Sequence, residues 1–150
     1  MANALFTGSF DPITIGHYDI IKRAAVIFEN VFVAVTINSE KSYMFSDDDR
    51  LEMTKKACSD LANVEVIFCS GLVAVLAKEK DAVIVKGVRN AVDFAYEYEM
   101  ASISKEISGV ETFIIPANPK LAYVSSTFVR EMIKYGNKPE RYIGRGIDTK

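Results

Sequence analysis

The only histidine of this 150-residue chain, His17, ends the segment GSFDPITIGH at residues 8–17. A short apolar run precedes this segment at residues 4–6, and an amphipathic stretch follows it at residues 18–29. His17 is therefore expected where a first strand passes into a first helix, a place where open α/β sheets bind ligands. Glycines and free helix-start N–H groups suit a phosphate there, and a histidine can donate a hydrogen bond to charge developing on a phosphoryl oxygen. The alternative is a surface or helix-capping histidine.

Three further polar segments each follow an apolar run, and they are Lys41, Lys86-Gly87-Val88-Arg89 and Ser125-Ser126-Thr127. Because parallel strands end at one edge of a sheet, we expect these segments to lie near His17. Together they offer three cations, several hydroxyls and backbone amides, which suits two phosphate-bearing ligands. Each lysine or arginine taken alone is more often a solvated surface charge, and it is their joint placement at strand ends that favours a binding site. Glu97 fits an exposed helix position as well as a ligand contact, and Asp11 before Pro12 is expected to shape the turn.

Strand-like and helix-like patterns alternate along the chain and must position these residues. Apolar, β-branched runs predict strands at residues 4–6, 31–37, 64–68, 82–85 (ended by Gly87) and 113–115. Helical patterns lie at residues 18–29, from Ser46 to about 61, 72–79, 93–108 and from Ser125 or Ser126 onward. The alternation predicts an α/β fold: one domain over residues 1–150, with a doubly wound five-stranded parallel sheet. We expect a loosely held tail from about residue 136.

Composition and missing motifs exclude several classes of protein. The net charge of −2 gives no basic field for nucleic acid, and no apolar run reaches the ~18 residues of a membrane helix. No signal-peptide pattern and no metal-type cysteine spacing is present, so Cys58 and Cys69 indicate free thiols in the cytoplasm. There is no G-x-G-x-x-G after the first strand and no P-loop. No Ser–His–Asp or Cys–His arrangement offers a covalent nucleophile.

At these residues the chain resembles a known family. The segment at residues 8–17 is similar to the signature of nucleotidyltransferases that carry a T/H-x-G-H motif. Three later segments narrow the resemblance: KGVR at residues 86–89, DFAYE at residues 93–97 and VSST at residues 124–127. In this order, over nearly the whole chain, they resemble bacterial phosphopantetheine adenylyltransferase, a family of coenzyme A synthesis.

The resemblance implies a Rossmann-like nucleotidyltransferase fold and transfer of the adenylyl group of ATP to 4′-phosphopantetheine, giving dephospho-CoA and pyrophosphate by direct in-line attack. It implies catalytic roles for His17 and Lys41, and phosphopantetheine contacts from Ser9, Lys41, Val73 and Lys86. ATP would be bound by Ser9, Phe10, Gly16, His17, Gly87, Val88, Arg89, Glu97, Leu121, Ala122, Tyr123, Val124, Ser125, Ser126 and Thr127. The family also implies Mg²⁺ carried by the ATP phosphates, with no protein metal site, and a homohexamer.

Some positions depart from the family pattern. Lys86 stands where many members have arginine, so a bidentate phosphate contact becomes a point charge. Val73 replaces a larger methionine, and Phe6-Thr7 replaces a Tyr-Pro pair before the first glycine. Two other functions remain consistent with the sequence. One is a nucleotidyltransferase for another small phosphate, such as nicotinate mononucleotide or glycerol phosphate, and the other is a non-catalytic nucleotide-sensing module.

Overall fold

The structure, a computed structural model, describes residues 2–144 and 147–149. Strands and helices alternate, as predicted. The strands are β1 (Asn3–Gly8), β2 (Asn30–Thr36), β3 (Val64–Cys69), β4 (Ala82–Val88) and β5 (Thr112–Pro116). The helices are α1 (Ile15–Ile27), α2 (Asp47–Ala57), α3 (Val73–Glu79), α4 (Ala91–Ser108) and α5 (Ser126–Lys134). The predicted α/β class is confirmed.

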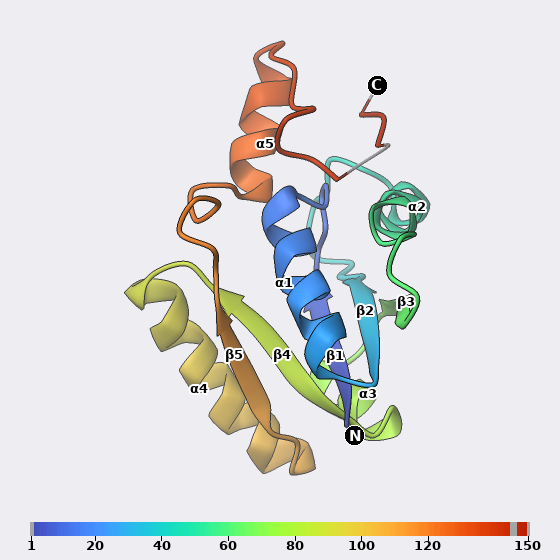
Figure 1. Cartoon of the computed structure of the whole chain (residues 1–150), viewed down its shortest axis with the longest axis vertical. Helices are drawn as coiled ribbons and strands as arrows, with labels where there is room; N and C mark the ends of the chain where they lie inside the picture. Colours follow the sequence, from blue (N-terminus) through green and yellow to red (C-terminus); the bar gives the residue numbers. More distant parts are fainter. Residues whose placement is uncertain (1, 145–146, 150) are drawn as a thin grey trace.

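All five strands are parallel and follow the order β3-β2-β1-β4-β5 (Figure 1). The chain therefore winds outward from β1 in one direction and from β4 in the other. Phe6 of β1 pairs with Val33 of β2 on one side and with Val85 of β4 on the other. The β1–β4 boundary is the point where the winding reverses, and the ends of these two strands diverge into a crevice there.

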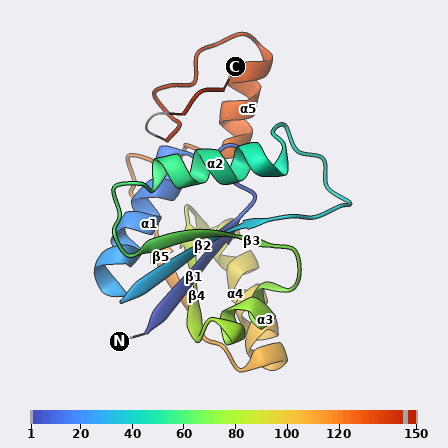
Figure 2. The same ribbon diagram turned by 90° about the vertical axis from the view of Figure 1, so that its right-hand side faces the viewer.

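Helices cover both faces of the sheet. Alternating residues of β1 show the two layers: Phe6 packs with residues of α1 and α2, whereas Leu5 packs with residues of α3. Helix α4 contacts α3, β4 and β5. Helix α5 lies beyond the carboxyl ends of the strands, at the end of the molecule opposite the N-terminus (Figures 1 and 2).

Two predicted boundaries near the crevice are wrong. Helix α1 begins at Ile15, not at residue 18, because the Thr14 side chain caps it by accepting a hydrogen bond from the His17 N–H. Gly87 does not end β4, since it pairs with Ile115 inside the sheet. A Cβ at Gly87 would lie 2.9 Å from Cγ1 of Ile20, so the glycine lets α1 lie close against β4.

Two predicted helix faces also differ from the structure. On α2, Thr54 and the C-cap Cys58 of the predicted stripe are buried, and Leu51 and Leu61 pack against the core. The buried face also includes Arg50, Met53 and Ala57. An arginine on the inner face was not predicted, because its charge argues for solvent. Helix α4 buries none of its residues, and its predicted apolar stripe is exposed at Tyr96, Met100, Ile103 and Ile107.

The segment after α5 is not loosely held throughout. Ile143 is buried and forms an isolated β-bridge with Thr14, and the Ile15 N–H donates to the Tyr142 carbonyl at 2.9 Å. The prediction of a loose tail from residue 136 was therefore wrong for the stretch at 142–143, because an apolar side chain anchors it beside the first turn. None of the described helices is both long and apolar enough to cross a membrane.

Candidate active site

His17 lies in the first turn of α1, with its ring held from two sides. The backbone N–H of Thr14 donates to His17 Nδ1 at 3.1 Å. The ring of Phe10 meets the imidazole edge to face, with 5.1 Å between centroids. A neutral imidazole that accepts at Nδ1 carries its proton on Nε2, so this contact selects the tautomer that can donate at Nε2.

The electrostatic surroundings keep His17 neutral. Burial, and secondarily the positive charge of Arg89, lowers the pKa of His17 from 6.5 to about 4. At neutral pH the side chain is therefore a hydrogen-bond donor without charge. It is unsuited to accept a proton as a general base, because a base with this pKa is weak and its free lone pair is engaged by Thr14.

Phe10 supports this arrangement from a strained backbone. It is 1% exposed and adopts a positive φ of 47°. A Cβ at Gly8 would lie 3.2 Å from its ring, which makes a small residue favourable there. The positive φ of Phe10 and the absence of a side chain at Gly8 together allow the Phe10 ring to pack against the His17 imidazole. Part of the Phe10 side chain also lines the cavity at the β1–β4 boundary.

A cavity of about 390 Å³, which we call the main cavity, opens at the β1–β4 boundary. Its polar lining includes Ser9, Thr14, His17, Lys41, Lys86, Arg89, Asp93, Glu97, Ser125, Ser126, Thr127 and Arg130. Four of these side chains are cationic and two are carboxylates. The first turns of α1, α4 and α5 all contribute residues, so helix N-termini add to the positive potential. The cavity suits a polyanionic ligand.

The two carboxylates of the main cavity are paired with cations. Lys86 Nζ lies 3.7 Å from Glu97 Oε2, and both side chains are largely buried. Arg89 Nε donates to Asp93 Oδ2 at 3.0 Å, and the same oxygen accepts from the Arg89 backbone N–H at 3.1 Å. Glu97 is therefore not an exposed helix residue, since it lines the main cavity and contacts Lys86.

Lys41 reaches the cavity from the loop at residues 38–45. Its Nζ donates to Ser9 Oγ at 3.0 Å, which joins the ends of β1 and β2. On the other side of these two residues lies a second cavity of about 370 Å³, which we call the side cavity. It is lined by Ser9, Thr36, Ile37, Asn38, Ser39, Lys41, Tyr43, Cys69, Ser70 and Gly71. Ser9 and Lys41 border both spaces.

Arg130 is a cavity residue that sequence reasoning missed. Its Nη1 donates to the Asp11 carbonyl at 2.9 Å, and its Nη2 donates to Thr127 Oγ1 at 3.1 Å. Helical spacing offered a signal, since Arg130 stands four residues after Ser126, and the two therefore share a face of α5. Ser126 Oγ itself donates to the Pro12 carbonyl at 2.8 Å, which ties the start of α5 to the first turn.

Most of the predicted contact residues border the main cavity, and four do not. Val73, Val88, Ala122 and Tyr123 are absent from the linings of the main and side cavities. Val73 packs with the layer formed by Leu5 and Ala34, two positions beyond the side-cavity residue Gly71. Tyr123 stacks edge to face on Tyr142, beside the segment that follows α5.

The remaining predicted features concern metals and thiols. Among the described residues there is no group of three or more His, Cys, Asp or Glu side chains placed to hold a metal ion. The acidic run at residues 47–49 opens α2, whose N-cap Ser46 accepts from the Asp49 N–H, as predicted. Cys58 and Cys69 are free and buried. Burial, with a smaller effect of Asp60, raises the pKa of the Cys58 thiol to about 12, so it is unreactive at neutral pH.

Comparison with known proteins identifies the family. A model of the cytidylyltransferase-like family matches residues 5–132. Phosphopantetheine adenylyltransferases of Caldanaerobacter subterraneus subsp. tengcongensis and Clostridium beijerinckii are each 43% identical over 138 residues, which is 91% of this chain and 86% and 87% of theirs. The Nocardioides sp. enzyme is 42% identical over 137 residues. The chain belongs to the phosphopantetheine adenylyltransferase family.

Solved structures agree with this family at the level of the fold. A Vibrio parahaemolyticus protein described as a candidate nicotinate-nucleotide adenylyltransferase superposes with a TM-score of 0.68 at 20% identity, covering 95% of this chain and 94% of its own. Plasmodium falciparum nicotinic acid mononucleotide adenylyltransferase, complexed with NaAD, gives 0.65 at 13% identity, covering 95% and 91%. At such identities the likeness shows the fold of this phosphopantetheine adenylyltransferase family member and not its acceptor.

Proposed function

We propose that the chain transfers the adenylyl group of ATP to 4′-phosphopantetheine, releasing pyrophosphate and forming dephospho-CoA. The observation that carries this proposal is the 42–43% identity, over 91% of the chain, to relatives named for that reaction. The site supports it physically. A cationic main cavity and a side cavity meet at Ser9 and Lys41, so two ligands can approach one another there.

The reaction needs alignment and charge stabilisation more than it needs proton transfer. An oxygen of the phosphopantetheine phosphate forms a bond to the α-phosphorus of ATP while the bond to the β-phosphate oxygen breaks. Pyrophosphate leaves with that electron pair. Because a phosphate monoester is already largely ionised at neutral pH, no general base is required. Catalysis then rests on positioning two anions and stabilising the charge of the transition state.

His17 and Lys41 are the proposed catalytic residues. The Nε2–H of neutral His17 donates to an α-phosphate oxygen as its negative charge grows. Lys41, held at Ser9, supplies the positive charge between the two ligands. Ser125, Ser126, Thr127 and Arg130 line the main cavity near the N-terminus of α5 and would bind the outer ATP phosphates.

The acceptor phosphate and the nucleotide would meet in the main cavity, and only the pantetheine arm would extend past Lys41 into the side cavity. Phosphopantetheine would use Ser9, Lys41 and Lys86 for its phosphate and the side cavity for its pantetheine arm. ATP would use Arg89, Glu97 and the α5 turn. Val73 lines neither cavity and lies two positions after Gly71 of the side cavity. Its proposed contact with phosphopantetheine would therefore be made by a pantetheine arm that extends beyond Gly71.

Magnesium belongs to this proposal as the partner of the ATP phosphates. The carboxylates of the main cavity, Asp93 and Glu97, are paired with Arg89 and Lys86 and so do not form a metal site of their own. This arrangement fits an ion that is held by the ATP phosphates. When bound with ATP, the ion would neutralise phosphate charge and orient the leaving group.

The test is incubation of the purified protein with ATP, Mg²⁺ and 4′-phosphopantetheine, followed by mass spectrometry. Dephospho-CoA and pyrophosphate should form in equal amounts. Nicotinate mononucleotide and glycerol phosphate serve as competing acceptors in parallel reactions. Adenylylation of either one in preference to phosphopantetheine would replace the proposed acceptor, and the absence of all products and of ATP–pyrophosphate exchange would favour the sensing module.

We also propose a homohexamer in the cytoplasm. The number six comes from the family resemblance. Support for an assembly comes from α4, where Val92, Phe94, Tyr96, Tyr98, Met100, Ile103 and Ile107 are all exposed large apolar or aromatic residues. Such a surface usually marks an interface. Phe68 of β3 is exposed as well, whereas Phe32 and Val66 pack against the two core layers and Tyr43 contacts Arg50. Two buried free cysteines suit a reducing compartment.

A further inference from the structure

The buried Arg50 lies where three segments that form the active site meet. Its side chain is fully shielded from solvent on the inner face of α2. Arg50 Nη1 donates to the Ser9 carbonyl at 2.8 Å and to the Thr36 carbonyl at 2.9 Å. Ser9 directly follows β1, and Thr36 is the last residue of β2. A single guanidinium nitrogen therefore sets the spacing between the two strand ends that carry Ser9 and lead to Lys41.

Arg50 also supports the loop at residues 38–45. Its guanidinium stacks on the ring of Tyr43, 3.7 Å from the centroid. The Tyr43 hydroxyl, near the end of the loop, accepts a hydrogen bond from the Asn38 N–H at its start, at 3.2 Å. This bond links the two ends of the loop. Asp47, one turn back on α2, pairs with Arg50 Nη2 and keeps the fork oriented. Lys41 lies within this braced segment.

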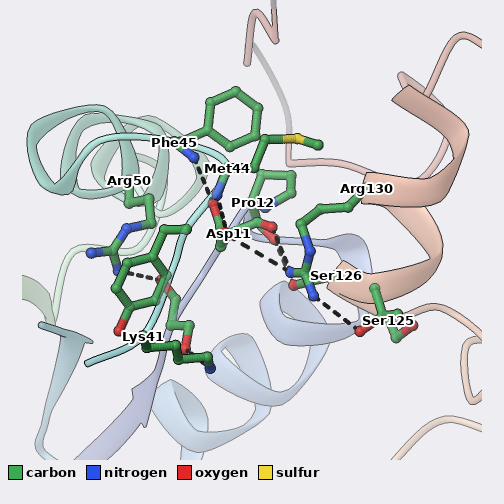
Figure 3. Close-up of polar contacts among 12 residues, drawn as sticks. Asp11, Pro12, Lys41, Met44, Phe45, Arg50, Ser125, Ser126 and Arg130 are labelled. Carbon is green, nitrogen blue, oxygen red and sulfur yellow. Dashed lines mark hydrogen bonds and ion pairs between the residues drawn. The ribbon is translucent and has the colours of Figure 1, made fainter. Parts of the chain in front are cut away.

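The far end of the same loop is anchored by a second buried charge. The Asp11 carboxylate accepts from the Met44 N–H and from the Phe45 N–H, each at 2.9 Å. Figure 3 shows Asp11 between this loop and Arg130 of α5, with Arg50 on the other side of the loop. Asp11 thus holds the end of the loop, and Tyr43, stacked on Arg50, holds its start. Between them, Lys41 Nζ donates to Ser9 Oγ.

From these contacts we infer that Arg50 is a positioning residue for the adenylyl transfer. It touches neither cavity and acts through Ser9, Tyr43 and the loop to hold Lys41 Nζ between the main and side cavities. The inference rests on the proposed function for its kinetic consequence, although the loop geometry is independent of it. A merely structural arginine would lower stability without any special coupling to Lys41.

A double-mutant cycle between Arg50→Lys and Lys41→Ala tests the inference. Lysine keeps the charge but cannot reach both carbonyls and stack on Tyr43 together. Arg50→Lys should lower kcat at least ~10-fold in the wild-type background with a small change in the KM for ATP, and less than ~3-fold when Lys41 is already alanine. Equal losses in both backgrounds would overturn the inference. Lys55→Ala, an exposed change on the same helix, is the matched control and should change neither parameter.

Two further measurements guard against ambiguous outcomes. If Arg50→Lys does not fold, Tyr43→Leu removes the ring that stacks on Arg50, and the same cycle with Lys41→Ala then applies. Tyr43→Phe keeps the ring but lacks the hydroxyl that accepts from the Asn38 N–H, so it should recover part of the lost kcat. Hydrogen exchange of the loop at residues 38–45 needs no activity. Faster exchange confined to this loop in Arg50→Lys is expected, and unchanged or uniformly faster exchange would overturn the inference. An inactive wild-type protein would refute only the proposed function.

Discussion

At the scale of single residues, the site depends on His17, which is neutral at pH 7 and is oriented at the edge of the main cavity. The Thr14 N–H defines which ring nitrogen carries the proton, and burial, with Arg89 second, lowers the pKa so that a second proton is disfavoured. This is the arrangement of an electrostatic donor, which must be oriented before charge develops.

Replacing His17 by alanine should lower turnover by about 10²–10³-fold, or ~3–4 kcal/mol of transition-state stabilisation, because one preorganised donor is lost. ATP affinity should change far less. His17→Gln places an amide N–H near the position of Nε2 and should retain more activity than alanine. Steady-state kinetics and ATP titration measure these effects. A His17→Ala variant with half the wild-type turnover would contradict the assigned role.

The lowered pKa of His17 makes stability depend on pH. The folded pKa of about 4 lies below the unfolded value of 6.5, so the unfolded chain takes up the proton first as pH falls. The contribution is complete above pH 6.5 and is lost progressively between pH 6.5 and 4, on the order of 3 kcal/mol in total. Urea unfolding at pH 7, 6 and 5 should show a steeper loss for wild type than for His17→Asn. Parallel curves would refute a buried neutral histidine.

At the scale of elements, the close packing of α1 on β4 brings the first turn beside the segment at residues 86–89. Gly87 makes this packing possible, because Ile20 of α1 occupies the space where a side chain would be. Asp11 and Arg50 hold the loop that carries Lys41 in the same way. The contacts made by Gly87, Asp11 and Arg50 therefore bring together site residues that follow β1 and β2 or lie in β4.

Gly87→Val should therefore destabilise the protein by about 1–3 kcal/mol through overpacking. The displaced α1 would also carry His17 away from the main cavity, so turnover should fall together with stability. Chemical denaturation and kinetics on the same samples measure both. Gly71→Ala is the matched control for stability, since no atom lies within 4 Å of its added Cβ. A stable, fully active Gly87→Val variant would show that α1 and β4 need not lie so close.

At the scale of the whole molecule, the exposed face of α4 is the feature that a single copy leaves unexplained. It adjoins α3, where Val75 is also exposed. An ordinary helix of a two-faced α/β layer buries a stripe, and this one buries none of its residues.

Ile103→Glu should break the proposed assembly, because it places a charge in the centre of this face. Light scattering coupled to size exclusion should give a mass near the 16.7 kDa monomer for the variant and a multiple of it for wild type. Val26→Glu is the control: Val26 is even more exposed but lies on α1, on the opposite face of the sheet. A monomeric wild-type protein at micromolar concentration would refute the oligomer.

The sequence alone determined the fold class and most of the cavity lining. Apolar β-branched runs alternating with helical periodicity specify a parallel sheet, and parallel strands place their carboxyl ends together. The polar residues at or after those ends, His17, Lys41, Lys86 and Arg89, were therefore found without coordinates, and the family resemblance followed from the order of the segments that hold them.

Only the tertiary structure decided which charges are buried and which apolar residues are not. Arg50 and Asp11 have the residue types of a solvated surface and a turn, and their roles depend on carbonyls and amides from segments distant in sequence. The stripe of α4 has the period of a core helix, but what covers it is set by the neighbours of that helix. Periodicity reports that a face is apolar, whereas burial depends on partners that local sequence does not encode.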